Sequence, residues 1–273
     1  MHESYRARYS RTMTWDRSSP GYLADWLPQL APYEADLAAE LGLHEGARVR
    51  CTAGPEAIAL ARAVGESGRV VAIAPTDEML ALCKERAAAA AVGDRVTCAR
   101  ACTEGGFDAA VSAFELDGLE ALRDAIGPRG KVGVMIWGPA ADDDPERVFA
   151  RAVDEAAPDL RASAPLAPTD RESLSRAFEA AGLVVVRHTV VSHAMIFPRA
   201  ERFAAALLGA RTYGAALRAR GQAAVAAALA RFYERSGGQD EPVTYEPAAT
   251  LVVAALPGAE IELPHRPSVR VPV

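Results

Sequence analysis

The sequence predicts an α/β protein built on a seven-stranded, mostly parallel, doubly wound sheet. Two observations predict this class. Short runs rich in β-branched residues alternate with longer segments rich in Ala and Leu, which is the pattern of βαβ units around a parallel sheet. The chain has 273 residues, of which 50% are hydrophobic and 24% charged, an ordinary globular balance that can bury a large core.

The elements follow one another in a regular order. Strands are expected at 48–52, 69–74, 95–99, 107–114, 131–137, 183–191 and 250–255. Helices are expected at 55–64, 77–91, 116–126, 145–157 and 170–181. Turn-forming residues separate them, because Gly65 and Gly68 end the first helix and Gly127, Pro128 and Gly130 precede the fifth strand.

Three segments fall outside this alternation. Residues 1–40 are expected to form an N-terminal arm and helical cap, 41–257 the main domain, and 258–273 a C-terminal tail. Within the main domain, 199–235 is a helical insert before the last strand. The insert is either a helical pair packed on the sheet edge or a lid over the mouth of a binding site.

Charge and composition exclude several classes of protein. The formal net charge of −6 argues against a nucleic-acid binder, which needs a basic face. No apolar run is long enough to span a membrane, and the basic start does not read as a secretory signal. The four cysteines suggest no disulfide framework, so reduced thiols in a cytoplasm are expected. The Ala- and Arg-rich composition indicates a bacterial genome rich in GC.

Four stretches in order carry a resemblance to a known family. They are ESGRVVAIAPTDEMLALCKERAAAA from Glu66, GGFDAAVSAFEL from Gly105, GPRGKVGVMIWGP from Gly127 and YEPAATLVVAALPG from Tyr245. Together with the order of elements over about 33–256, they resemble class I S-adenosylmethionine-dependent methyltransferases, especially the small-molecule branch with ubiquinone-type C-methylases. The resemblance implies a Rossmann-like sheet with an antiparallel last strand and a cofactor site after the first strand.

The resemblance also implies which residues would hold the cofactor. In that family the first strand ends in an acid and a loop of about three alternating glycines follows. Here the acid is replaced by Cys51, Ala53 lies in a shortened loop, only Gly54 survives, and Glu56 replaces the last glycine.

Two further acids of the family are missing. The acid that hydrogen-bonds to the ribose hydroxyls in that family corresponds to Ala74 here. The aspartate that hydrogen-bonds to the adenine amine corresponds to Cys102. A buried charged hydrogen bond contributes roughly 1.5–3 kcal/mol, so losing two or three weakens binding at least about a hundredfold. No cofactor is therefore expected, and S-adenosylmethionine only if the site proves functional.

Other residues are candidates with two interpretations each. Glu115 ends the fourth strand and is either catalytic or a solvated residue opening the next helix. His193, preferred over His188, is either a general base in the pocket or a hydrogen-bonded structural histidine. Cys51, Cys98 and Cys102 either bind a metal or fill space left by lost polar residues, and the spacing favours filling.

The large aromatic residues are candidates for the substrate pocket. The chain has few, so the ones near the cap and the fifth strand are conspicuous: Trp15, Tyr22, Trp26 and Trp137. Each either lines a substrate cavity or packs against the sheet.

Three functions remain open from the sequence. The first is a small-molecule enzyme that no longer methylates, such as a secondary-metabolite cyclase. The second is a methyltransferase with an atypical cofactor site, and the third is a non-catalytic protein that stabilises or regulates a partner. The expected partners are a small-molecule substrate and a second chain, either a homodimer copy or an active relative, with no nucleic acid and no membrane.

Overall fold

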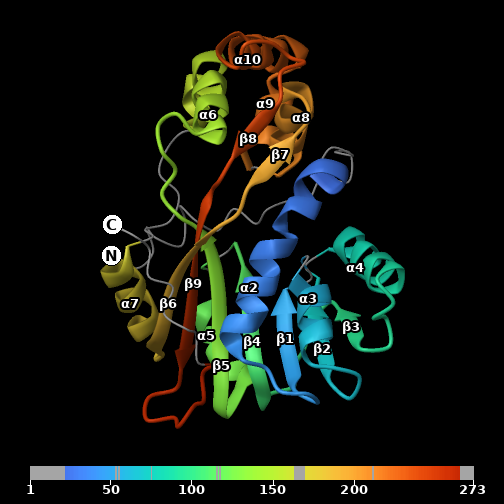
Figure 1. Ribbon diagram of the computed structural model, residues 1–273, viewed down its shortest axis with the longest axis vertical. Coiled ribbons are helices and arrows are strands. Elements are labelled where there is room, and N and C mark those ends of the chain that lie inside the picture. The colour runs from blue at the N-terminus through green and yellow to red at the C-terminus, as the bar shows by residue number, and fades with distance from the viewer. Residues whose placement is uncertain are drawn as a thin grey trace. The chain divides into compact units, whose positions relative to one another are not determined.

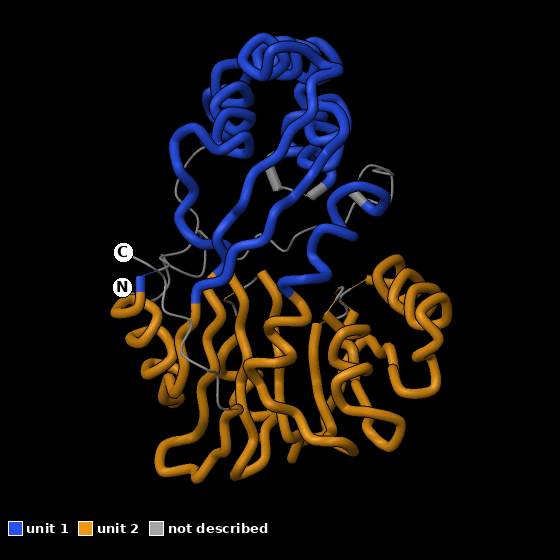
Figure 2. The backbone as a smooth tube through the Cα atoms, viewed as in Figure 1, with its two compact units in different colours: residues 1–33, 137–170, 190–249 blue, residues 34–136, 171–189, 250–273 orange. Residues whose placement is uncertain are grey.

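The computed structural model describes residues 22–52, 54, 56–74, 76–114, 116, 118–162, 170–210 and 212–264 (Figure 1). The chain divides into two compact units, each assembled from separate segments (Figure 2). Unit 1 comprises 1–33, 137–170 and 190–249, and unit 2 comprises 34–136, 171–189 and 250–273. Helix α2 (Ala31–Leu41) passes from one unit to the other after Tyr33.

Unit 2 contains the sheet that the sequence predicts. Its strands are β1 (Arg48–Thr52), β2 (Arg69–Ile73), β3 (Val96–Ala99), β4 (Phe107–Ala113), β5 (Ile126–Trp137), β6 (Val184–Ser192) and β9 (Ala248–Ala255), and the ends of β5, β6 and β9 continue into unit 1. They are ordered β3-β2-β1-β4-β5-β9-β6. Strands β1 to β5 pair in parallel, and Figure 1 shows β9 running in the opposite direction. The predicted fold class is confirmed.

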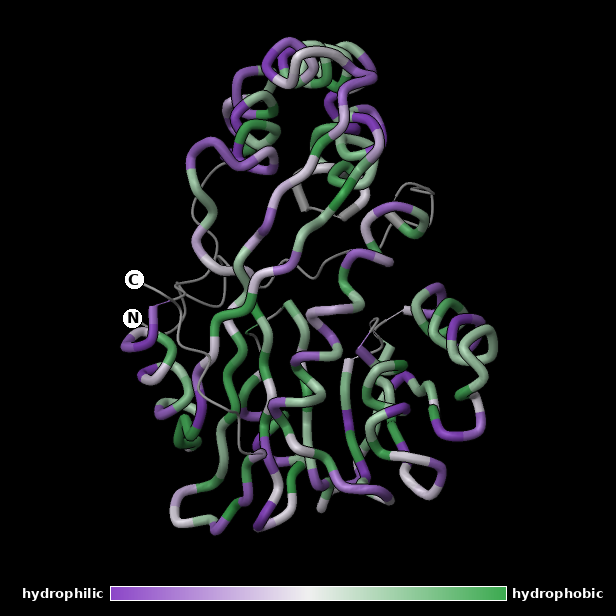
Figure 3. Tube along the Cα trace, in the orientation of Figure 1, coloured by the Kyte–Doolittle hydropathy of each residue, from purple (hydrophilic) through white to green (hydrophobic). Residues whose placement is uncertain are grey.

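Alternation along β5 assigns helices to the two faces of the sheet. Val132 and Val134 belong to a buried cluster that includes side chains of α5 (Leu119–Ala125) and α7 (Arg171–Ala180). Gly133 points the other way, where an added Cβ would lie 2.9 Å from the Leu41 side chain of α2. A larger residue at this position would force the Leu41 side chain to move, because α2 packs directly on the strand. Figure 3 shows the corresponding hydrophobic colouring along β5 and β9.

Most predicted boundaries hold within a few residues, and one turn is misplaced. The residues predicted as a turn before the fifth strand lie inside β5, which begins at Ile126. Ile126 pairs with Phe107, and the register then shifts before Lys131 pairs with Ala109. The glycines and proline at 127–130 therefore make an irregularity within a strand pairing.

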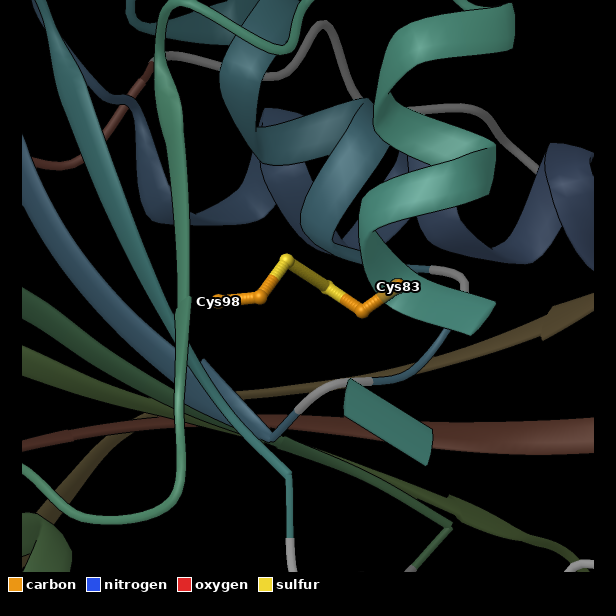
Figure 4. Close-up of a disulfide and its surroundings, with 2 residues drawn as sticks. All are labelled: Cys83 and Cys98. Carbon is orange, nitrogen blue, oxygen red and sulfur yellow. A yellow bond between two sulfur atoms is a disulfide. The ribbon is translucent and has the colours of Figure 1, made fainter. Parts of the chain in front are cut away.

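The prediction of four reduced thiols is wrong for one pair. Cys83 on α4 (Asp77–Ala89) and Cys98 on β3 form a disulfide, with Cα atoms 6.3 Å apart (Figure 4). The chain leaves α4 through a short turn and returns as β3, so a helix side chain that faces the sheet meets a strand side chain 15 residues later. Cys51 and Cys102 are free thiols.

Unit 1 has its own core, which is largely aromatic. Its helical elements are η1 (Tyr22–Trp26), η2 (Leu27–Leu30), α6 (Pro145–Ala156), η3 (Pro158–Leu160), α8 (Ala200–Ala210), α9 (Thr212–Ala219) and α10 (Gln222–Arg235). A two-stranded sheet of β7 (Met195–Phe197) and β8 (Val243–Tyr245), which the sequence analysis missed, accompanies them. The Phe203 ring stacks on Phe232 at 5.7 Å between centroids.

No helix among the described residues combines the length and apolarity needed to cross a membrane. The insert predicted at 199–235 corresponds to α8, α9 and α10, and its role as a lid stays a prediction.

Candidate functional site

The carboxyl end of β1 is where this sheet topology places a ligand site. The chain runs from β1 outward to β2 and β3, then crosses back to β4 on the other side of β1. In open α/β sheets, ligands bind beyond the carboxyl ends of the strands where the order reverses in this way. The residues after β1 and at the adjoining strand and helix ends therefore form the candidate site.

Cys51 is the last but one residue of β1 and points into the core. Its side chain is buried, and burial followed by the nearby Glu56 carboxylate raises the pKa of the Cys51 thiol well above its usual range. The thiol therefore stays protonated at neutral pH and is a poor nucleophile or metal ligand. No group of three or more His, Cys, Asp or Glu residues in the described part of the chain is arranged to hold a metal ion.

Glu56 is buried at the start of α3 (Glu56–Ala63), with 1% of its surface exposed. The Thr52 hydroxyl donates to its Oε1 at 2.5 Å, which fixes the side chain against the end of β1. The positive end of the helix dipole also favours a carboxylate at this position. A Cβ on Gly54 would overlap the Glu56 carboxyl group, so Glu56 covers the surviving glycine of the loop.

The other positions implied by the resemblance carry no carboxylate. Ala74 follows β2 and is fully buried, and Cys102 is half-buried with its thiol 4.0 Å from the carbonyl oxygen of Glu104. Ala53 lies outside the described residues.

These residues do not fit S-adenosylmethionine as the resembled family holds it. In that family the backbone of the loop is exposed to the cofactor, whereas here Glu56 places a buried carboxylate over it. The family also has acids at the positions that Cys51, Ala74 and Cys102 occupy in this chain. A glycine loop works because nothing lies between its backbone and the ligand.

A second buried acid, Glu34 on α2, interacts electrostatically with Glu56 and was not singled out from the sequence. Its side chain is 6% exposed, and its Oε1 has no hydrogen-bond partner among the described residues. Burial, and then the Glu56 carboxylate, raise the pKa of Glu34 to about 8, while Arg86 of α4 lowers it. The two carboxyl groups are thus close enough for their charges to interact.

A signal for Glu34 was present in the sequence. Residues 34, 37, 38 and 41 share one face of α2, and the other three are Leu37, Ala38 and Leu41, all buried. Glu34 therefore occupies an apolar position of an amphipathic helix. A charged residue at such a position is a candidate functional group.

The predicted aromatic and histidine candidates gather in unit 1 around Tyr33. The Trp137 ring lies 5.4 Å from the Tyr33 ring and 6.3 Å from the Trp26 ring, in both cases edge to face. The His193 ring meets Tyr33 at 4.8 Å, and the backbone N–H of His193 donates to the Tyr33 hydroxyl at 3.0 Å. The Tyr33 hydroxyl in turn lies 2.6 Å from the carbonyl oxygen of Pro247, to which it donates.

This arrangement supports packing roles for these residues, and their roles as a base or pocket wall stay predictions. Burial is the main cause that raises the pKa of Tyr33. Trp15 and Glu115 lie outside the described residues, as does the side chain of Tyr22.

Comparison with known proteins identifies the class of the fold. No family model and no curated protein matches the sequence. Among solved structures, a SAM-dependent methyltransferase from Thiobacillus denitrificans in complex with S-adenosyl-L-homocysteine is 17% identical, with 93% of this chain and 98% of that chain covered and a TM-score of 0.51. The chain has the class I methyltransferase fold.

Two other solved structures are similar to this chain. The [4+2]-cyclase SpnF is 19% identical, with 89% of this chain and 86% of that chain covered and a TM-score of 0.51. A SAM-dependent O-methyltransferase from Thermotoga maritima is 15% identical, with a TM-score of 0.45. The match covers 84% of this chain and 66% of the Thermotoga protein, so the chain spans about two thirds of that protein's length.

Proposed function

We propose that this protein is a small-molecule enzyme that uses the methyltransferase fold without S-adenosylmethionine bound in the usual way. The observation that carries the proposal is the Glu56 carboxyl group, buried over Gly54 at the end of β1. The presence of Cys51, Ala74 and Cys102 where the resembled family has acids also argues against the usual binding of the cofactor.

The expected loss of binding free energy is large enough to favour complete loss of cofactor binding over weakened binding. Each missing charged hydrogen bond removes roughly 1.5–3 kcal/mol, so two or three of them turn a micromolar site into a millimolar one or weaker. The Glu56 carboxylate adds the cost of moving a buried, hydrogen-bonded side chain aside.

A reaction that needs no methyl donor suits this fold. Holding one flexible substrate in a reactive conformation supplies a large part of the barrier to a cyclisation or rearrangement. The fold is shared with a [4+2]-cyclase, which supports a reaction of this kind here.

The test is isothermal titration of the purified protein with S-adenosylmethionine and S-adenosylhomocysteine up to millimolar concentration. We expect no binding heat and no shift of the melting temperature. The variant C51D/E56G/A74D restores three family residues and is expected to gain detectable binding of both compounds. Its matched control, C51N/E56G/A74N, has the same shape without the charges and is expected to bind neither.

Micromolar binding by the unmodified protein would refute the proposal and make methyl transfer the leading function. Circular dichroism and melting curves check that the variants fold. If the restored variant does not fold, the titration of the unmodified protein still decides the question.

A further inference from the structure

Helix α4 is attached to unit 2 by a narrow stripe of side chains, and the disulfide lies in the middle of that stripe. Of its 13 residues, the buried ones are Met79, Cys83 and Ala87, each four positions after the last. Leu80 and Leu82 are half-buried. A helix packed on a sheet commonly buries three or four side chains in every two turns, so α4 has a weak apolar attachment. The bond from Cys83 to Cys98 of β3 therefore carries a large part of the attachment of α4.

The start of α4 adjoins the candidate site. Ala74, at the end of β2, donates its backbone N–H to the carbonyl oxygen of Ala99 at 2.8 Å. Thr76, two residues later, is the N-cap of α4. Across from it, Arg100 pairs with Asp77 at 3.7 Å, and both side chains are exposed, so this ion pair adds little. A change in the position or order of α4 therefore reaches the chain beside the candidate site.

The disulfide lies at an edge of the sheet. In the described part of the chain β3 is the end strand, and Cys98 stands opposite Ala72 of its neighbour β2. Cys98 is half-buried, whereas Cys83 on the helix is buried (Figure 4). Exposed disulfides are the ones that exchange with thiols, because the attacking thiolate has to reach one of the two sulfur atoms. Cys98 is the more accessible end of this bond.

We propose that Cys83 and Cys98 form a site of reversible thiol–disulfide exchange with a protein dithiol, and that their redox state decides whether α4 is held against β3. The bond closes the loop between the two cysteines, which are 15 residues apart, and so limits local opening of α4. The proposal goes beyond the proposed function and does not depend on which reaction the protein catalyses.

The exchange conserves electrons and protons. A thiolate of the partner dithiol attacks the Cys98 sulfur, the S–S bond breaks, and Cys83 leaves as a thiolate. The second thiol of the partner, once deprotonated, attacks the mixed disulfide and releases Cys98. Two electrons pass to the cysteine pair, the partner is oxidised to a disulfide, and the two protons of the partner end on Cys83 and Cys98. The same steps in reverse re-form the bond.

The first measurement is hydrogen–deuterium exchange of the full chain before and after dithiothreitol treatment without denaturant. Iodoacetamide labelling and mass spectrometry report the fraction of Cys83 and Cys98 that is reduced. After reduction we expect α4 amides to exchange at least about tenfold faster, and oxidised dithiothreitol to reverse the change. Amides of β4 and β5 are the internal reference and should not change. The melting temperature should fall by about 5 to 10 °C on reduction.

Two variants separate this pair from the other thiols. Cys83→Ala/Cys98→Ala cannot form the bond, so its α4 amides should exchange at the rate of the reduced protein with or without dithiothreitol. Cys102→Ala removes a free thiol and keeps the disulfide, so it should respond to dithiothreitol as the unmodified protein does. If the double variant does not fold, the reversible measurement on the unmodified protein still decides the question.

Three outcomes would overturn the proposal. The bond could resist dithiothreitol until urea unfolds the chain, which would make it a permanent staple. Reduction could proceed and leave exchange of the α4 amides unchanged, which would show that the bond does not hold the helix. Labelling could find both thiols free even after treatment with oxidised dithiothreitol. None of these results depends on S-adenosylmethionine binding, so they are distinct from a failure of the proposed function.

Discussion

The two ends of helix α2 each bury a glutamate, and the two glutamates differ in their ion-pair partners. Glu40 is 1% exposed, and the Arg187 guanidinium of β6 donates to its Oε2 at 3.0 Å. Arg187 also donates to the carbonyl oxygen of Pro264 at 2.9 Å. Glu34 is 6% exposed and has no comparable ion pair in the described part of the chain.

The difference separates an acid that pairs with a cation from an acid that lies near another acid. Glu40 and Arg187 join α2 to β6 through a geometry that offsets the loss of hydration at both groups. Glu34 interacts instead with another acid, so its burial is a net cost to the fold. Burial of a carboxyl group therefore identifies a candidate site only when its partners are also known.

The largest expected effect concerns Glu34 and pH. An acid whose folded-state pKa is raised from 4.5 to about 8 keeps its proton in the folded chain while the unfolded chain loses it. The contribution of Glu34 to stability is therefore intact below pH 4.5, falls as pH rises, and is fully lost above pH 8. The total loss is on the order of 5 kcal/mol.

Urea unfolding of the unmodified protein and of Glu34→Gln between pH 5 and pH 9 measures this loss. The variant should lack most of the decline and should be the more stable protein at pH 9. Equal pH dependence of the two proteins would remove the contrast between Glu34 and Glu40.

The next largest effect concerns Glu40, the glutamate of α2 that forms an ion pair with Arg187. Arg187→Met leaves the Glu40 carboxylate buried without its cation, which is expected to lower the free energy of unfolding by about 3 to 5 kcal/mol. The double variant Arg187→Met/Glu40→Met removes both charges and should recover most of the loss. A single variant as stable as the unmodified protein at neutral pH would show that Glu40 gains nothing from Arg187.

The smallest effect concerns Tyr33, the residue before Glu34. Tyr33→Phe removes a hydroxyl that donates to the Pro247 carbonyl and accepts from the His193 N–H. Leaving those two backbone groups unsatisfied is expected to cost about 1 to 2 kcal/mol, measured by thermal unfolding. Tyr233→Phe, which changes a half-buried tyrosine of α10, is the control and should stay within about 0.5 kcal/mol of the unmodified protein.

Local sequence patterns predicted the sheet well because its strands and helices are each specified by their own residues. The alternation of β-branched and Ala-rich segments located all seven strands of unit 2. The irregular start of β5 was missed, because the glycines and proline at 127–130 carry the residue types of a turn whether or not the chain pairs with Phe107. Strands β7 and β8 were missed because each has three residues and depends on a partner far along the chain.

By itself, the sequence determined the fold class. It also led to the prediction of a site after β1, where Cys51, Ala74 and Cys102 stand at positions that are acidic in the resembled family. Only the tertiary structure decided which buried groups meet. It joined Cys83 to Cys98, paired Glu40 with Arg187, and brought Glu34 near enough to Glu56 for their charges to interact. The physical reason is that periodicity records whether a side chain faces the core, whereas the charge of a buried group depends on neighbours that the chain brings together from distant segments.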